Sequence, residues 1–120
     1  MSLKKFVSSC TITFKSFEYK VSMNKSKTVL WHFCAKSPLT PKTYVVMCVP
    51  CLKSGKNLIK AALNKLQAGE KLVIVCDSYT EVEFSEAESK NYSLITLKDI
   101  NRYGMEMLEI RQRESIELAV

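Results

Sequence analysis

The clearest hydrophobic pattern lies in the middle of the chain. Residues 44–47 form a short apolar run rich in β-branched side chains, which predicts a buried strand that ends before Pro50. An amphipathic helix is predicted next, with an N-cap at Ser54 and a stop at Gly69. Its apolar positions recur at helical spacing: Leu58, Ile59, Ala62, Leu63 and Leu66. Residues 72–76 predict a second strand, buried on both faces as in a parallel pair.

The amino-terminal third predicts a β-hairpin. Residues 11–23 alternate between apolar and polar positions, residues 28–35 are mostly apolar, and a polar turn separates them. Residues 1–10 are basic and poorly patterned, so we expect an arm or a first edge strand there. Residues 37–42 hold two prolines and predict the connector between the hairpin and the strand–helix–strand unit.

The pattern after the second strand predicts one more helix and two more strands. Residues 78–90 carry apolar positions at helical spacing, with Thr80 or Ser78 as the N-cap and glutamates on the outer side. Residues 92–100 and 105–111 alternate as strands and are separated by a turn.

The element order from residue 44 is therefore βαβαββ. This order predicts an α/β two-layer sandwich, in which two helices pack on one face of a mixed four-stranded sheet. We expect the amino-terminal hairpin to extend that sheet or to cover its open face. The chain of 120 residues suits one domain. Within it we expect a hairpin extension at 1–43, the core at 44–113 and a tail at 114–120.

The net charge of +6 is unevenly distributed along the chain. Residues 1–66 carry twelve lysines and one acid, Glu18, whereas residues 67–120 carry six Lys or Arg and eleven acids. Opposite halves of this kind suggest that one surface meets an anionic partner, although a solvated surface with chance asymmetry explains them equally well.

The five cysteines do not indicate a disulfide framework, because the count is odd and the amino terminus lacks the hydrophobic region of a signal peptide. No apolar run is long enough to span a bilayer, so we expect a cytoplasmic protein with no membrane partner. Cys34 and Cys76 lie in apolar runs and are typical of packed residues. Cys48 and Cys51 lie at the strand-to-helix junction, where the positive end of the helix would stabilise a thiolate on Cys51.

These junction residues resemble a known family. Pro50-Cys51-Leu52, a helix and then residues 67–75 (QAGEKLVIV) are similar to the TusA/SirA sulfur-carrier family, over about residues 44–113. That family is a βαβαββ sandwich with Cys-Pro-x-Pro at the start of its first helix; here Leu52 stands in place of the first proline. The resemblance implies that Cys51 carries a persulfide, which it accepts from a donor protein and passes to an acceptor. It implies no metal and no organic cofactor.

Two other site chemistries use the same cysteines. Cys48 and Cys51 have the Cys-x-x-Cys spacing of a thioredoxin-like pair that acts by thiol–disulfide exchange, but no proline follows Pro50 to face such a pair. His32 and Cys34 would complete a zinc ligand set with them, although the chain has only one Cys-x-x-Cys.

Nucleic-acid binding is the alternative function. The βαβαββ order also resembles Alba-type chromatin proteins and the carboxy-terminal domain of translation initiation factor three. The Gly-Arg motif of Alba proteins is missing after the second strand, where residues 77–79 read Asp-Ser-Tyr. A phosphate-contacting face would use the lysines of the predicted helix and hairpin. They are Lys53, Lys56, Lys60 and Lys65 of the helix and Lys15, Lys20, Lys25 and Lys27 of the hairpin.

The first hypothesis is therefore a TusA-like sulfur carrier, or a degenerate relative that only binds partners. Cys51 and Cys48 are its candidate catalytic residues. Lys53, Lys56 and Lys60 are candidates for anion or partner contacts. The expected partners are sulfur donor and acceptor proteins, a second copy of the chain in a homodimer and, in the alternative, a nucleic acid. Residues 34–36 lack the acid two positions before the lysine that a restriction-endonuclease-like metal site needs, so metal-dependent cleavage is not predicted.

Overall fold

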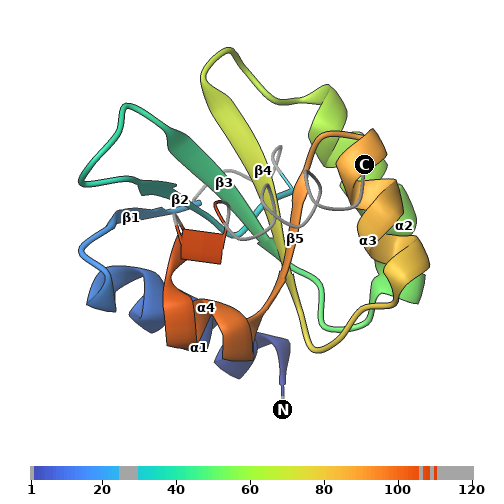
Figure 1. Cartoon of the computed structure of the whole chain (residues 1–120), viewed down its shortest axis with the longest axis horizontal. Helices are drawn as coiled ribbons and strands as arrows, with labels where there is room; N and C mark the ends of the chain where they lie inside the picture. The colour runs from blue at the N-terminus through green and yellow to red at the C-terminus, as the bar shows by residue number, and fades with distance from the viewer. Residues whose placement is uncertain (1, 25–29, 106, 109, 111–120) are drawn as a thin grey trace.

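A mixed five-stranded sheet runs through the middle of the molecule (Figure 1). The computed structural model describes residues 2–24, 30–105, 107, 108 and 110. The described part of the chain contains these elements in order: α1 (Leu3–Ser16), β1 (Lys20–Met23), β2 (Phe33–Lys36), β3 (Thr43–Cys48), α2 (Leu52–Asn64), β4 (Glu70–Cys76), α3 (Glu81–Ser89), β5 (Ser93–Thr96) and α4 (Leu97–Tyr103).

The strands lie side by side in chain order, from β1 at one edge to β5 at the other. β1 pairs with β2 and β2 with β3 in antiparallel register, whereas β3 pairs with β4 and β4 with β5 in parallel register. The predicted parallel pair is thus present as β3 and β4. A hairpin is also present, but it is shorter than predicted, since β1 and β2 pair over four residues each. It extends the sheet beyond β3, which is the first of the two arrangements that we expected.

Helices cover both faces of the sheet, so the molecule has three layers. Helices α2 and α3 lie on one face and α1 and α4 lie on the other (Figure 1). A separate apolar core fills each interface: Phe6, Phe14 and Tyr44 belong to the α1 side, and Ile59 and Ile74 belong to the α2 side. The prediction of a two-layer βαβαββ sandwich with a four-stranded sheet is therefore wrong.

Helix α1 is the first reason for that error, because residues 3–16 were expected to form an arm and part of a strand. In the structure Ser2 is the N-cap, and its side chain accepts a hydrogen bond from the Lys5 N–H. In the predicted strand, Ile12 and Phe14 would share one face, but residues two apart lie on opposite sides of a helix. Phe14 is accordingly 0% exposed and Ile12 is 65% exposed.

The end of the chain is the second reason, because two strands were expected after α3. Among the residues described after α3, only β5 is a strand, and α4 begins directly after it. Thr96 is the N-cap of α4, and its hydroxyl accepts a hydrogen bond from the Asp99 N–H at 3.1 Å. Beyond Gly104 the described residues are helical, with Met105 and Leu108 buried at a spacing of three. The predicted strand at 105–111 is therefore wrong, and the tail at 114–120 lies outside the described residues.

The central strand–helix–strand unit agrees with its prediction except at the ends of the helix and at Leu58, which was expected on the apolar face but is 50% exposed. α2 begins one turn earlier than expected, with Cys51 rather than Ser54 as its N-cap. It ends at Asn64, and Gly69 instead occupies the turn before β4 with a φ of 82°. For α3, Thr80 is the N-cap, as one of the two predicted alternatives.

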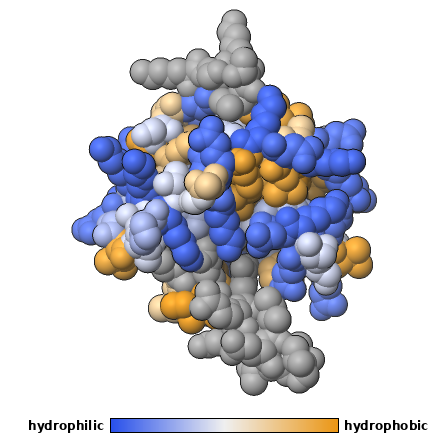
Figure 2. Space-filling model, turned by 90° about the horizontal axis from the view of Figure 1, so that it is seen from above, coloured by the Kyte–Doolittle hydropathy of each residue, from blue (hydrophilic) through white to orange (hydrophobic). Residues whose placement is uncertain are grey.

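The surface combines a hydrophilic covering with local apolar exposure. Figure 2 shows hydrophilic side chains over most of one side of the molecule, with a hydrophobic patch open between them. The Cα radius of gyration is 13.5 Å, close to the value of about 13.6 Å for a compact domain of this length. Within the described ranges, no helix has the length and apolar character needed to cross a membrane.

Candidate functional site

Cys51 lies at the start of α2, just beyond the carboxyl end of β3. Its side chain is exposed, and its sulfur makes no capping hydrogen bond to the first turn of the helix. Its carbonyl oxygen instead accepts a hydrogen bond from the Ser54 hydroxyl at 3.0 Å. The first turn of α2 contains no acidic side chain and includes the exposed Lys53. The structure thus presents this thiol to solvent beside the positive end of a helix dipole.

Cys48 lies three residues earlier in a very different environment. Its side chain is 3% exposed and packs with the fully buried Cys10 in the core between α1 and the sheet. The hydrogen bond between the Cys48 and Cys10 thiols, and then burial, hold the pKa of Cys48 far above its usual range. None of the five cysteines forms a disulfide bond. The structure therefore gives Cys48 and Cys51 separate environments, one in the core and one in solvent.

The proposed zinc ligands do not converge either. Nδ1 of His32 accepts a hydrogen bond from the backbone N–H of Cys48 at 2.9 Å, so this nitrogen is already occupied. Burial lowers the pKa of His32, which keeps the imidazole neutral. Among the residues that the structure describes, no group of three His, Cys, Asp or Glu side chains is placed to hold a metal ion.

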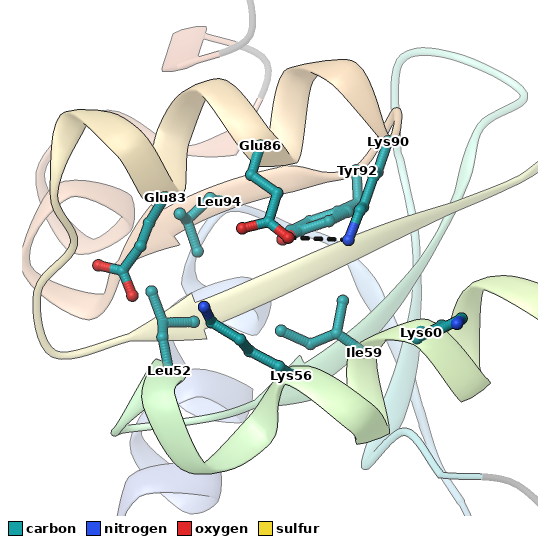
Figure 3. A pocket seen from close by; sticks show the side chains of 9 residues that line it. All are labelled: Leu52, Lys56, Ile59, Lys60, Glu83, Glu86, Lys90, Tyr92 and Leu94. Atoms are coloured by element: carbon teal, nitrogen blue, oxygen red, sulfur yellow. Dashed lines mark hydrogen bonds and ion pairs between the residues drawn. The ribbon is translucent and has the colours of Figure 1, made fainter.

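A groove between α2 and α3 brings together two of the three predicted anion contacts, Lys56 and Lys60 (Figure 3). Lys53 does not line it. Its apolar part is formed by Leu52, Ile59, Tyr92 and Leu94. On the facing helix, Figure 3 shows Glu83 and Glu86 opposite Lys56. The groove is therefore of mixed charge and is not a simple anion site.

An ion pair on α3 accounts for the electrostatics of this groove. Nζ of Lys90 lies 2.8 Å from Oε1 of Glu86, one helical turn away. The hydrogen bond from Lys90 lowers the pKa of Glu86 and, reciprocally, raises the pKa of Lys90. Burial, followed by the Glu86 charge, raises the pKa of Tyr92. The positive charge of Lys56 adds a smaller effect and also lowers the pKa of Glu86, so this lysine already lies near an acid of the protein.

A second cationic site lies on the hairpin. Lys20 of β1 and Lys36 of β2 are direct cross-strand partners, and both are exposed. Val21 and Ala35 belong to the core on the α1 side, so by alternation the two lysines point to the other face of the sheet. In the described ranges neither lysine forms an ion pair with an acid. The sequence pattern singled out Lys20 but missed Lys36, which only the hairpin register could have revealed; Lys25 and Lys27 lie outside the described residues.

The order of the strands in the sheet places basic and acidic segments of the chain at opposite edges. Because the strands follow one another in chain order, β1 and β2, which carry Lys20 and Lys36 and no acid, lie at one edge. The acidic α3 follows β4 and packs near β5 at the opposite edge. With strands about 4.8 Å apart, the two edges of a five-stranded sheet are about 19 Å from each other. The molecule therefore has a basic end and an acidic end.

Comparison of the chain with protein-family models, with curated proteins and with solved structures finds no match. The resemblance to sulfur carriers stays a prediction, and the fold that it implied is replaced by the observed one. Function is argued below from the placement of individual residues.

Proposed function

We propose that the protein binds the phosphate backbone of a nucleic acid at its basic end. The observation that carries this proposal is the cross-strand pair of Lys20 and Lys36. Like charges directly opposite each other in a sheet cost stability, and here the charges are not offset by a described acid. A bound phosphate between the two ammonium groups would remove that repulsion.

The surroundings of the pair support a contact with a polyanion. Lys42 follows in the connector between β2 and β3, where the Ser37 N–H donates to the Lys42 carbonyl. Among the described residues of the first half of the chain, Glu18 is the only acid. Lysines on flexible stems suit phosphate contacts that carry no base information, so we expect binding that tolerates changes in nucleotide sequence.

Helix α2 has a smaller part in this proposal. Lys53 is exposed at its start and lies outside the groove, so it is available to an anionic ligand. Lys56 lies opposite Glu83 and Glu86 instead, and Lys60 lines the same groove (Figure 3). Lys53 is therefore the predicted helix contact that we retain.

The test is fluorescence anisotropy of a labelled oligothymidine strand, titrated with the full chain at several salt concentrations. Each phosphate contact contributes a slope of about 0.7 in log K against log salt for a single strand. The variant Lys20→Gln/Lys36→Gln should reduce the slope by about 1.4. The control Lys90→Gln/Lys98→Gln changes the net charge equally but alters the other end of the molecule. Affinity that does not depend on salt, or that falls equally in both variants, contradicts the proposal.

The placement of Cys51 favours a second candidate function, a persulfide carrier. In this role the Cys51 thiolate attacks the outer sulfur of a donor persulfide. A sulfur–sulfur bond forms on Cys51, the donor's sulfur–sulfur bond breaks, and the donor leaves as a thiolate. The step requires an accessible thiol, and the side chain of Cys51 is exposed.

Intact-mass measurement after incubation with a small-molecule persulfide tests this second function. We expect the mass of one added sulfur atom on the natural chain and on Cys34→Ser, but not on Cys51→Ser. No addition to the natural chain, or the same addition to Cys51→Ser, contradicts the role of Cys51.

A further inference from the structure

A groove on the α1 side of the sheet concentrates apolar side chains that are open to solvent. Leu3 and Ile12 of α1 and Met23 of β1 line it, and they are 50%, 65% and 49% exposed. Val7 continues the apolar wall one turn after Leu3. Exposed apolar side chains gathered in one groove, rather than scattered singly, mark an interaction site.

The shape of this groove follows from the contact between α1 and the hairpin. Thr11 Oγ1 lies 4.0 Å from the Met23 sulfur, so the helix forms one wall and the hairpin forms the other. The lining extends from Leu3 to Lys15, which is about 18 Å along the helix axis. A helix of three turns has nearly the same length, about 16 Å.

Positive charge lies at both ends of the apolar wall. Lys4 lies at one end and Lys15 at the other, and the described residues that line the groove include no acid. His32 also lines it. Because Nδ1 of His32 accepts the hydrogen bond from Cys48, the neutral ring carries its proton on Nε2 and offers a donor. The groove is thus complementary to an apolar surface flanked by carboxylates.

We propose that this groove binds an amphipathic α-helix of a partner protein, with an apolar stripe that covers Ile12 and Met23 and acidic residues that meet Lys4 and Lys15. This is recognition of a helix in a groove. A second copy of α1 does not fit, because α1 contains lysines and no acid and would place like charges together. The site is also separate from the proposed phosphate contacts, because Lys20 and Lys36 point to the opposite face of the sheet.

The probe is a synthetic fluorescein-labelled helical peptide, with leucines on one face and glutamates elsewhere. A matched peptide has lysines in place of the glutamates. We expect saturable binding of the acidic peptide to the full chain, measured by anisotropy, and much weaker binding of the basic peptide. The variant Lys4→Glu/Lys15→Glu should reverse this preference, which a structural effect alone would not do.

A second pair of variants locates the site. Ile12→Ser/Met23→Ser should weaken binding of the acidic peptide by about tenfold or more, as expected for the loss of about 1.4 kcal/mol at the centre of an interface. The control Leu39→Ser/Leu58→Ser alters exposed apolar residues elsewhere and should leave affinity unchanged. Equal binding of both peptides, or equal loss in both pairs of variants, overturns the proposal. Self-association that the acidic peptide does not dissociate would assign the groove to a second copy and also overturn it.

Discussion

The backbone N–H of Cys48 donates a hydrogen bond to Nδ1 of His32 across a distance of 2.9 Å. Cys48 is the last residue of β3, and His32 precedes β2 and donates its own N–H to the carbonyl of Val46. The imidazole therefore completes the pairing of β2 with β3 at the end of the central strand. This role requires an unprotonated Nδ1, which agrees with the lowered pKa of the buried ring.

Stability should depend on pH through His32. Its pKa in the folded chain is below the ordinary value of 6.5, so the unfolded chain binds the proton more readily. The stabilisation is present above pH 6.5 and is lost as the pH falls through the lower, folded value. Urea unfolding at several pH values measures this. The chain has one histidine, so His32→Asn should remove this part of the pH dependence, and an unchanged profile in that variant contradicts the assignment.

Removing the acceptor should also cost stability at neutral pH. The variant His32→Ala leaves the Cys48 N–H, on a residue that is 3% exposed, without its partner. We expect a loss of about 1–3 kcal/mol in the free energy of unfolding, the cost of a buried unsatisfied donor. Equal stability of His32→Ala and the natural chain would show that water accepts the hydrogen bond from the Cys48 N–H in place of the imidazole.

A change to the pair of Lys20 and Lys36 that stabilises the fold should at the same time weaken nucleic-acid binding. Lys20→Glu replaces a like-charge cross-strand pair with an opposite-charge pair, and we expect a gain of about 0.2–1 kcal/mol in the free energy of unfolding. The same variant should weaken oligonucleotide binding. Lys98→Glu, with the same change in net charge on α4, is the control and should not show the gain. A loss of stability in Lys20→Glu would contradict the claim that Lys20 and Lys36 repel each other.

Thiol reactivity should differ sharply between the cysteines. Cys51 is exposed and should react first with a maleimide at neutral pH, followed by the half-buried Cys34, whose pKa is raised by burial and then by Glu70. Cys48 should resist, and so should Cys76, because burial, then Glu83, raises its pKa to about 12. Peptide mapping by mass spectrometry after timed labelling measures the order. Early labelling of Cys48 would show that α1 opens from the sheet.

The capping box of α3 should contribute measurably to stability. The Thr80 hydroxyl accepts a hydrogen bond from the Glu83 N–H at 3.2 Å, and the Glu83 carboxylate accepts one from the Thr80 N–H at 2.9 Å. Thr80→Ala should lower the free energy of unfolding by about 1 kcal/mol. Ser78→Ala, two residues earlier in the same exposed loop, is the matched control and should have little effect. The same midpoint in denaturant for both variants would contradict the capping role.

Several features of the fold were predictable because they depend on local sequence. The apolar run at 44–47 and the run at 72–76 form neighbouring parallel strands, and the helix between them has its apolar side on the sheet. The hairpin was also predictable, although β1 is limited to Lys20–Met23. The position of Cys51 beside a helix start was also predictable, even though the N-cap was placed three residues too late.

Other features required the assembled molecule. Residues 11–16 are rich in β-branched and aromatic side chains, which favour a strand locally. The segment is helical in the structure, because a helix buries Phe6, Cys10 and Phe14 together against the open face of the sheet. The same applies after β5, where Ile100 and Met105 become core residues of helical segments. The contact between Cys10 and Cys48 and the pairing of Lys20 with Lys36 join residues that are distant in the chain.

By itself, the sequence determined the strand–helix–strand centre, the hairpin and the separation of charge between the two halves of the chain, because apolar spacing and composition are local properties. Only the tertiary structure decided that helices cover both faces, that Cys48 is buried while Cys51 is exposed, and that two lysines lie opposite each other. Those outcomes depend on which surfaces remain uncovered once the sheet has formed. Those surfaces are covered when residues that are distant in the chain pack together, and the local sequence does not specify this packing.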